Sequence, residues 1–386
     1  MGKNKPFWTP VLLIALLCVA MQSPVVEADV VAVRASDAHA QHHVQSRAPA
    51  PTGYSALVVF GASYVDNAHP RADVYKSSMR NYYPYSSAGG RYSNGPVGVE
   101  YMVASGTSPA LKQHGKSAVK LFNYAYGGSV IRNGLGEASS SYPATRDQVA
   151  AYISDLKRSR IDIGKGRVLH FFNTGINPVT QIWLKVLNGN MSVASMNTAR
   201  NNIKSNSAAL AEFITSTSQS VTGSVLSRKR TRPGSVVDIS PYFGHTQRIS
   251  SVAAADFLIA GIPPLEIVPT FGYQIPSTYT ATQRAQALSI LKDLSARFNS
   301  DVQRFVSSFK PTSSKVFYYD LAALWRDLTN SPSKYGIKVI NKTCYDSTSG
   351  AVCMKPTEYI YFDTLHPVTS VHKIWASKMN ALVNAS

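Results

Sequence analysis

The chain has 386 residues, of which 44% are hydrophobic and 16% are charged. A chain of this length and composition buries a large core, so an intrinsically disordered protein is excluded. The 39 lysines and arginines outnumber the 21 acidic residues and give a net charge of +18, which favours association with anionic surfaces or polymers. Since no nucleic-acid-binding motif accompanies this charge, we expect no nucleic-acid partner.

Residues 1–28 have the layout of a secretory signal peptide. Lysines near the start precede an apolar run over residues 11–20, and small residues at Val26 and Ala28 offer a cleavage site. The apolar run is too short to span a bilayer well, and no later run approaches the required length. The sequence therefore predicts a secreted, extracellular protein without a membrane span.

The rest of the chain is expected to form one domain behind a short lead-in. Residues 29–52 are rich in Ala, His and Gln, which predicts a flexible segment, and residues 53–386 show no internal repeat or second boundary. Within them, residues 222–248 interrupt the pattern and carry the basic run Arg228-Lys229-Arg230-Thr231-Arg232. We expect this run to lie in a solvated loop, and cleavage by a dibasic-specific protease is the alternative.

Strands and helices alternate along this domain. Short apolar runs predict strands at residues 56–60, 119–123, 167–173, 256–260 and 316–320. Helical spacing and helix-start signals predict helices at residues 96–103, 145–158, 179–187, 193–217, 280–309 and 370–383. This alternation predicts an α/β fold with a parallel five-stranded sheet covered on both faces. Ligands of such sheets bind at the carboxyl ends of the strands.

Two features agree with an oxidising, extracellular compartment. Cys18 is removed with the signal peptide, and Cys344 and Cys353 are expected to form a disulfide that closes a short loop. Glycosylation motifs occur at Asn190, Asn341 and Asn384. Because two thiols without nearby histidines make a poor ligand set, we expect no metal and no other cofactor.

The run Leu57-Val58-Val59-Phe60 ends at Gly61, and Ser63 follows two residues later. This pattern predicts a buried strand that gives way to a helix, with the Ser63 hydroxyl exposed at the carboxyl edge of the sheet. Backbone N–H groups at a helix start point outward and attract anions. Ser63 is therefore a candidate nucleophile.

Asp363-Thr364-Leu365-His366 places a carboxylate three residues before an imidazole, just upstream of the last predicted helix. At this spacing Asp363 can accept a hydrogen bond from Nδ1 of His366 while Nε2 takes a proton from a serine. The alternative is a surface Asp and His in a loop. The Gly-x-Ser strand end and the other glycine-ended strands favour the catalytic interpretation.

Two other strand ends offer donors for an oxyanion. The N–H of Gly128 has no side chain in the way, and Asn177 has an amide NH₂ held by the turn that Gly175 permits. Together with the N–H of Ser63 they would form a three-donor oxyanion hole. The sequence leaves Gly127 open as an alternative to Gly128, and a turn or helix-cap role open for Asn177.

The order Ser63, Gly128, Asn177, Asp363-x-x-His366 resembles the GDSL/SGNH hydrolases, and the similarity runs from about residue 54 to the C-terminus. Further similar segments lie at residues 90–96, 123–128, 257–264 and at the cysteine pair. The chain looks most similar to the secreted fungal branch, which includes carbohydrate acetylesterases and lipase-like enzymes. The resemblance implies a three-layer α/β/α sandwich of the flavodoxin-like SGNH type, serine acyl-enzyme chemistry and no metal.

Three positions depart from the family pattern. Ala62 and Tyr64 replace the aspartate and leucine of Gly-Asp-Ser-Leu, and Pro178 replaces the aspartate that usually follows the asparagine. None of these changes removes one of the four chemical roles, so we expect the support around the serine and the asparagine to come from elsewhere. Asp66 matches an acidic position of the family, and we interpret it as a brace for the turn and not as the triad acid.

Six tyrosines crowd the loops expected near the site: Tyr64, Tyr82, Tyr83, Tyr85, Tyr92 and Tyr126. Tyrosine suits sugar rings because it combines an apolar face with a polar tip, although ordinary loop packing explains the same residues. We expect a serine esterase that releases acetyl or other short acyl groups from a carbohydrate. The alternatives are a lipase or phospholipase, and a catalytically idle basic protein that binds an anionic polysaccharide surface.

Overall fold

The computed structural model describes residues 51–68, 90–222, 252 and 254–385. All of them belong to one compact unit, which runs from Pro49 to Ser386. The predicted signal peptide, the lead-in up to residue 50 and the basic run at residues 228–232 lie outside the described residues.

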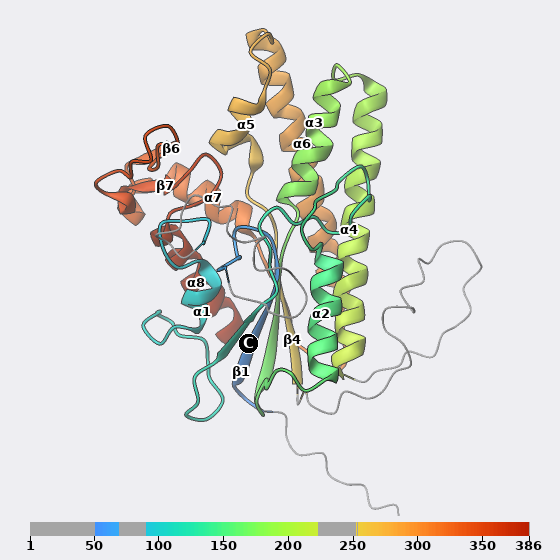
Figure 1. The fold of residues 1–386 in the computed structure, drawn as a ribbon, viewed down its shortest axis with the longest axis vertical. Coiled ribbons are helices and arrows are strands. Elements are labelled where there is room, and N and C mark those ends of the chain that lie inside the picture. Colours follow the sequence, from blue (N-terminus) through green and yellow to red (C-terminus); the bar gives the residue numbers. More distant parts are fainter. Residues whose placement is uncertain (1–50, 69–89, 223–251, 253, 386) are drawn as a thin grey trace, which may run out of the picture. The chain divides into compact units, whose positions relative to one another are not determined.

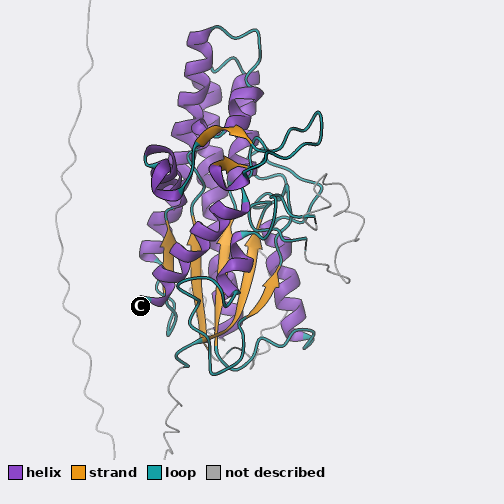
Figure 2. Cartoon of the chain, turned by 90° about the vertical axis from the view of Figure 1, so that its left-hand side faces the viewer, coloured by secondary structure: helices purple, strands orange, loops and turns teal. Residues whose placement is uncertain are grey.

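A five-stranded parallel sheet forms the centre of the fold. Its strands are β1 (Tyr54–Gly61), β2 (Lys120–Asn123), β3 (Arg167–Asn173), β4 (Ala254–Ala260) and β5 (Val316–Tyr319). The spatial order is β2-β1-β3-β4-β5, the order of flavodoxin-like sheets. The predicted fold class is confirmed, and each predicted strand end lies within two residues of the observed one. Figure 2 shows the strands pointing in one direction.

Helices cover both faces of this sheet (Figure 1). One face carries α1 (Gly98–Val103) and α8 (Thr369–Asn384), which pack against each other. The other face carries α2 (Thr145–Lys157), α4 (Val193–Thr222) and α6 (Ala281–Ser308). Strands β3 and β4 are buried along their whole length, because helices cover them on both sides and strands flank them on both edges.

Several elements differ from the prediction. Helix α3 begins at Ile176 and ends at Asn188, so it starts three residues earlier than its apolar spacing suggested. Four elements were not predicted: α5 (Pro269–Gln274), α7 (Leu321–Asn330), β6 (Val339–Thr343) and β7 (Tyr359–Tyr361). Short 3₁₀ turns lie at Leu265–Ile267, Pro332–Tyr335 and Pro356–Glu358. Strands β6 and β7 pair with each other in a second, parallel sheet, and this long-range pairing leaves little local signal.

A buried ion pair joins the amino ends of the central strands. Arg167 at the start of β3 donates to the carboxylate of Asp256 in β4, which is fully buried. The same carboxylate accepts the hydroxyl of Tyr54 in β1 at 2.8 Å and the backbone N–H of Lys315 at 2.7 Å. These bonds satisfy both oxygens, which is what a buried carboxylate needs to remain charged.

We expect acid to destabilise the fold through His170. This side chain is fully buried in β3, 2.9 Å from the Tyr152 hydroxyl, and burial lowers its pKa to about 4. The unfolded chain binds a proton near pH 6.5, so the free energy of unfolding should fall between about pH 6.5 and 4, by on the order of 3 kcal/mol. Urea unfolding at several pH values would measure this. His170→Gln should show a smaller loss on acidification, and an equal loss would contradict the assignment.

Candidate active site

The serine lies in a single turn at the end of β1. Backbone N–H groups of Val65 and Asp66 donate to the carbonyl oxygen of Ala62 at 3.1 and 3.0 Å, which closes a turn around Ser63. The prediction of a helix directly after the strand is wrong, because residues 62–65 form a turn and residues 66–68 are irregular. The carbonyl of Asn173, at the end of β3, accepts the N–H of Ala62 at 3.3 Å and so keeps the turn at the carboxyl edge of the sheet.

Ser63, His366 and Asp363 form a hydrogen-bonded chain. Nε2 of His366 lies 2.8 Å from Oγ of Ser63, although 303 residues separate them in the sequence. Nδ1 of His366 lies 2.7 Å from Oδ2 of Asp363. Ser63 and His366 are 7% and 6% exposed, so their hydrogen bond is largely shielded from water while the hydroxyl stays at the edge of the sheet.

Asp363 also shapes its own loop. Its Oδ1 accepts the backbone N–H groups of Leu365 and His366 at 2.8 and 2.6 Å, and its Oδ2 is left to face the imidazole. The hydroxyl of Tyr64, the residue after the serine, donates to the carbonyl oxygen of Leu365 at 2.8 Å. The turn that carries the serine and the loop that carries the histidine are therefore bonded directly to each other.

The segment at residues 90–96 holds the chain that follows His366. The hydroxyl of Ser93 donates to the Pro367 carbonyl at 2.9 Å, and Oδ1 of Asn94 accepts the N–H of Thr369 at 2.8 Å. Thr369 in turn donates to the Pro96 carbonyl at 2.8 Å. These bonds fix the start of α8, directly after the histidine.

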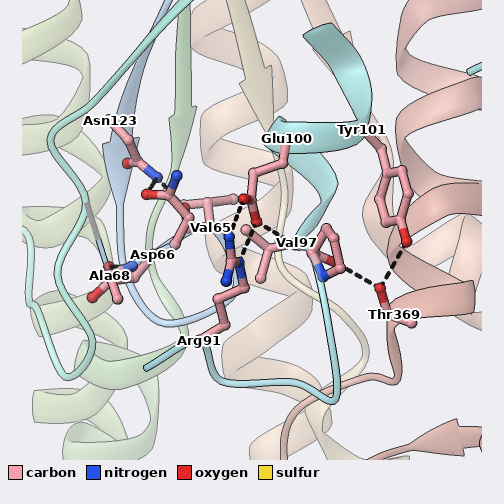
Figure 3. A network of polar contacts seen from close by, with 11 residues as sticks. Val65, Asp66, Ala68, Arg91, Val97, Glu100, Tyr101, Asn123 and Thr369 are labelled. Carbon is pink, nitrogen blue, oxygen red and sulfur yellow. Dashed lines mark hydrogen bonds and ion pairs between the residues drawn. The ribbon is translucent and has the colours of Figure 1, made fainter. Parts of the chain in front are cut away.

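Figure 3 shows the polar network around this segment. Arg91 donates to both carboxylate oxygens of Glu100 at 2.7 and 2.6 Å, and Glu100 also accepts the N–H of Val97 at 2.8 Å. The hydroxyls of Tyr101 and Thr369 are 2.9 Å apart. Helix α1 is thus tied at its start to the segment and on its side to α8.

The structure favours Gly128 over Gly127 as an oxyanion donor. The N–H of Gly127 donates to Oδ2 of Asp66 at 2.8 Å and is therefore engaged. The N–H of Gly128 makes no hydrogen bond with any residue that the structure describes. Gly128 has φ +77°, and a Cβ there would lie 2.9 Å from the Tyr142 ring, so only glycine suits this position.

Asn177 lies in the first turn of α3, and its Nδ2 donates to the Ser129 carbonyl at 2.7 Å. An amide nitrogen carries two hydrogens, so one donor remains. Gly175 before it has φ +133°, and a Cβ there would lie 2.4 Å from the Phe298 ring. Pro178 is tolerated because N–H groups in the first turn of a helix have no partner within it.

Sequence reasoning missed one buried amide, that of Gln148 in α2. Its Oε1 accepts the N–H of Gly61 at 2.8 Å, and its Nε2 donates to the Gly61 carbonyl at 2.9 Å. Nε2 also lies 3.0 Å from Oγ of Ser129, the residue after Gly128. The available signal was a glutamine on the apolar face of the predicted helix, four residues before Tyr152.

Figure 3 shows the side chains of Asp66 and Asn123. They bond to the turn around Ser63 and to residues 124–128, which we call the glycine loop. Oδ1 of Asp66 accepts the N–H of Ala68 at 2.9 Å, while Oδ2 accepts that of Gly127. Nδ2 of Asn123 donates to the Val65 carbonyl at 2.6 Å. The geometry agrees with a bracing role for Asp66, which lies on the glycine-loop side of the turn and bonds to backbone groups there.

The three tyrosines of the cluster that the structure describes are packed inside the domain. Tyr64, Tyr92 and Tyr126 are buried, and the Tyr92 ring packs against His366 with 5.0 Å between ring centres. The remaining three lie outside the described residues: Tyr82, Tyr83 and Tyr85. A half-buried tyrosine that was not anticipated, Tyr142, packs beside Gly128.

The predicted disulfide is present in the structure, between Cys344 and Cys353. Its loop is bonded to the chain before Asp363, since the N–H of Cys344 donates to the Tyr361 carbonyl at 3.1 Å. In the described ranges no three His, Cys, Asp or Glu side chains are grouped to hold a metal ion. None of the helices in those ranges is long and apolar enough to cross a membrane.

The three glycosylation motifs differ in their surroundings. Asn190 and Asn341 are exposed, in the turn between α3 and α4 and in β6. Nδ2 of Asn384, the atom that a glycan would modify, donates to the Ala110 carbonyl at 2.8 Å. Use of these motifs stays a prediction, and the first two are the accessible ones.

A serine, an imidazole and a carboxylate bonded in this order are the arrangement by which serine hydrolases carry out acyl transfer. The family model of the GDSL-like lipases/acylhydrolases matches residues 57–379. The chain therefore belongs to the GDSL-like lipase/acylhydrolase family, and it is an ester-bond hydrolase.

Similar proteins include two from Arabidopsis thaliana. GDSL esterase/lipase 7 is 23% identical over 343 residues, which cover 83% of this chain and 86% of that protein. GDSL esterase/lipase EXL2 is 22% identical over 145 residues, 34% of this chain and 37% of that protein. Both are plant proteins, so the placement in a fungal branch stays a prediction.

Two solved structures are also similar. An extracellular lipase from Streptomyces rimosus has a TM-score of 0.40 at 12% identity, and covers 85% of this chain and 99% of its own. A phospholipase A1 from Streptomyces albidoflavus NA297 has a TM-score of 0.39 at 13% identity, with the same coverage.

We expect Gln148→Met to slow ester hydrolysis, because two residues before Ser63 the N–H of Gly61 loses its Gln148 partner and the Gly61 carbonyl keeps only the N–H of Tyr126. A displacement of the serine by about 1 Å costs up to roughly a hundredfold in rate, so kcat should fall by at least about tenfold while KM changes little. The matched control is Asn380→Leu, which removes another fully buried amide, bonded to the carbonyls of Met102 and Pro109. Equal losses of kcat in the two variants would show a general loss of stability instead.

Proposed function

We propose that the chain is a serine esterase that works through an acyl-enzyme. Oγ of Ser63 attacks the ester carbonyl while Nε2 of His366 accepts its proton, and Asp363 stabilises the imidazolium that forms. The observation that carries this proposal is the hydrogen-bonded chain from Ser63 through His366 to Asp363. His366 then gives the proton to the leaving alcohol, and a water that it activates releases the acyl group.

In this mechanism the negative charge on the carbonyl oxygen is held by three donors. They are the N–H groups of Ser63 and Gly128 and the remaining amide hydrogen of Asn177. The N–H of Ser63, like that of Gly128, has no hydrogen-bond partner in the described part of the chain. Each donor of this kind lowers the barrier by about 3 kcal/mol, because it is aimed before the charge develops.

For the substrate we propose acetyl or another short acyl group on a carbohydrate. The support is Tyr142, a half-buried ring beside Gly128 that offers an apolar face and a polar tip. A long-chain lipid ester is the second candidate, favoured by exposed apolar side chains on two segments. One is α5, where the N–H of Thr270 donates to the Thr364 carbonyl, and the other is the disulfide loop, which bonds to residues 361 and 362. Tyr273 in α5 is 73% exposed, and Met354 beside the disulfide is 98% exposed.

Ser63→Ala and His366→Ala should each reduce the hydrolysis of p-nitrophenyl acetate by at least about a thousandfold, because each removes a group that moves the proton. Ser117→Ala and His114→Ala, in a loop at the opposite edge of the sheet, are the matched controls. A fluorophosphonate should label Ser63, as mapped by peptide mass spectrometry. Near-normal turnover by either site variant, or a label on another serine, would falsify the assignment.

The acyl-chain preference separates the two substrate classes. If the acyl site accepts only short chains, kcat/KM for p-nitrophenyl acetate should exceed that for the palmitate ester by at least about tenfold. The reason is that methylene groups that do not fit the site stay in water and contribute no binding energy. Release of acetate from an acetylated oligosaccharide would support the carbohydrate directly. A preference for palmitate would rule out the short-acyl proposal and support the lipid ester.

A further inference from the structure

Basic residues gather at the edge of the sheet opposite the catalytic residues. Three loops enter strands at this edge, at residues 104–119, 158–166 and 309–315, and we call them together the basic edge. They contain seven lysines and arginines and a single acidic residue, Asp162. Figure 2 shows the strands starting at this edge and pointing away from it.

Most of this positive charge is not neutralised. Asp162 is bonded to Lys120 at the start of β2 at 2.6 Å, so it offsets little of the charge of the loops themselves. Five exposed cations make no ion pair with any described residue: Lys112, Lys116, Arg158, Lys165 and Lys310.

One of the three loops, at residues 104–119, is held in place by backbone bonds. The N–H of Tyr54 donates to the Lys112 carbonyl at 2.8 Å, and the N–H of His114 donates to the Tyr54 carbonyl at 2.8 Å. The side chain of Asn384 binds the same loop, through the N–H of Lys112 at 3.0 Å. A cavity of about 260 Å³ opens between them, lined in part by Lys112, Arg167 and Lys315. The backbone that carries Lys112 and Lys116 is therefore fixed to β1 and α8 before a ligand approaches.

The charges near the catalytic edge are arranged differently, because many of them are paired. Arg91 binds Glu100 at 2.6 Å, and Lys338 binds Glu358 at 2.8 Å. Lys334 binds Asp327 at 3.0 Å. The basic edge itself carries a net charge of +6, from seven cations and one acid, out of the total of +18. It is separated from the serine by about 25 Å along the eight-residue strand β1.

The chemistry of the basic edge favours a flexible polymer of carboxylates. Four of the five cations named above are lysines, which act as hydrated point charges and accept an anionic group in many orientations, as a flexible polymer presents it, whereas arginine binds a carboxylate or a phosphate with two-pronged geometry. None of the large exposed apolar side chains of the described residues lies in these loops, so there is no wedge for a bilayer. Their one aromatic residue, Phe309, packs on the core and offers no platform for a nucleic-acid base.

We propose that the basic edge is a docking surface for an acidic polysaccharide, a polymer of uronic acids. Docking there leaves the catalytic edge open to esters on the same or a neighbouring polymer chain. The proposal does not depend on which ester is cleaved. It requires binding that weakens with salt and that leaves the hydrolysis of a small ester unchanged.

The test uses the full-length chain and immobilised polygalacturonate. The triple variant Lys112→Glu, Lys116→Glu, Lys165→Glu should lose at least about tenfold in affinity, since three attractive contacts become repulsive. The matched control, Lys185→Glu, Lys204→Glu, Lys292→Glu, changes the net charge equally on helices α3, α4 and α6 and should lose less than about twofold. Both variants should hydrolyse p-nitrophenyl acetate like the unmodified chain, which shows that they are folded.

Equal losses in the two triple variants would overturn the proposal, because net charge alone would then account for binding. Unchanged affinity of the basic-edge variant would also overturn the proposal. Binding would then come from cations that this variant keeps, such as those at residues 228–232. Tighter binding to phosphatidylserine vesicles or single-stranded DNA than to polygalacturonate would replace the polysaccharide by that partner. Loss of esterase activity with retained binding would count against the proposed function and not against the docking surface.

Discussion

The hydrogen bond between Ser63 and His366 joins a turn near the start of the described chain to a loop near its end. Much of the surrounding structure can be understood as holding these two segments at 2.8 Å. The serine turn is bonded to the histidine loop through the Tyr64 hydroxyl, and the residues after the histidine are bonded to the segment at 90–96. The disulfide loop is bonded to Tyr361 and Phe362, directly before Asp363. An imidazole in such a frame needs little reorganisation when it takes up a proton.

The departures from the family pattern are easier to understand in this frame. The methyl group of Ala62 cannot form a hydrogen bond that braces the turn, and the bracing bonds come instead from Gln148 and Asp66. Both reach the glycine loop as well: Gln148 contacts Ser129, and Asp66 engages Gly127. One set of side chains therefore holds the turn around Ser63 and residues 127–129 together, and the N–H of Gly128 makes no hydrogen bond with a described residue.

The two edges of the sheet have different electrostatic characters. At the amino edge, the buried carboxylate of Asp256 binds Arg167 and Tyr54 inside the fold, so it does not neutralise the exposed cations of the described loops. Towards the carboxyl edge several described charges are paired, Arg91 with Glu100 among them, and buried hydrogen bonds hold the turn around Ser63. Parallel topology produces this separation, because every strand enters at one edge and leaves its functional residues at the other. Binding of a polymer and cleavage of an ester are thereby compatible on one small domain.

The sequence by itself determined the α/β class, the five strands and the three residues that the structure joins as Ser63, His366 and Asp363. It could do so because buried parallel strands are short apolar runs, and because the glycine after such a run marks the edge where side chains become accessible. Only the tertiary structure showed that the N–H of Gly127 is bonded to Asp66 while that of Gly128 has no partner among the described residues. It also revealed the Gln148 bonds and showed that Tyr64, Tyr92 and Tyr126 are packed inside. These outcomes depend on which groups meet across long sequence distances. A hydrogen bond such as that of Gln148 to Gly61 leaves no periodic signal in the residues that form it, whereas the burial of a strand does.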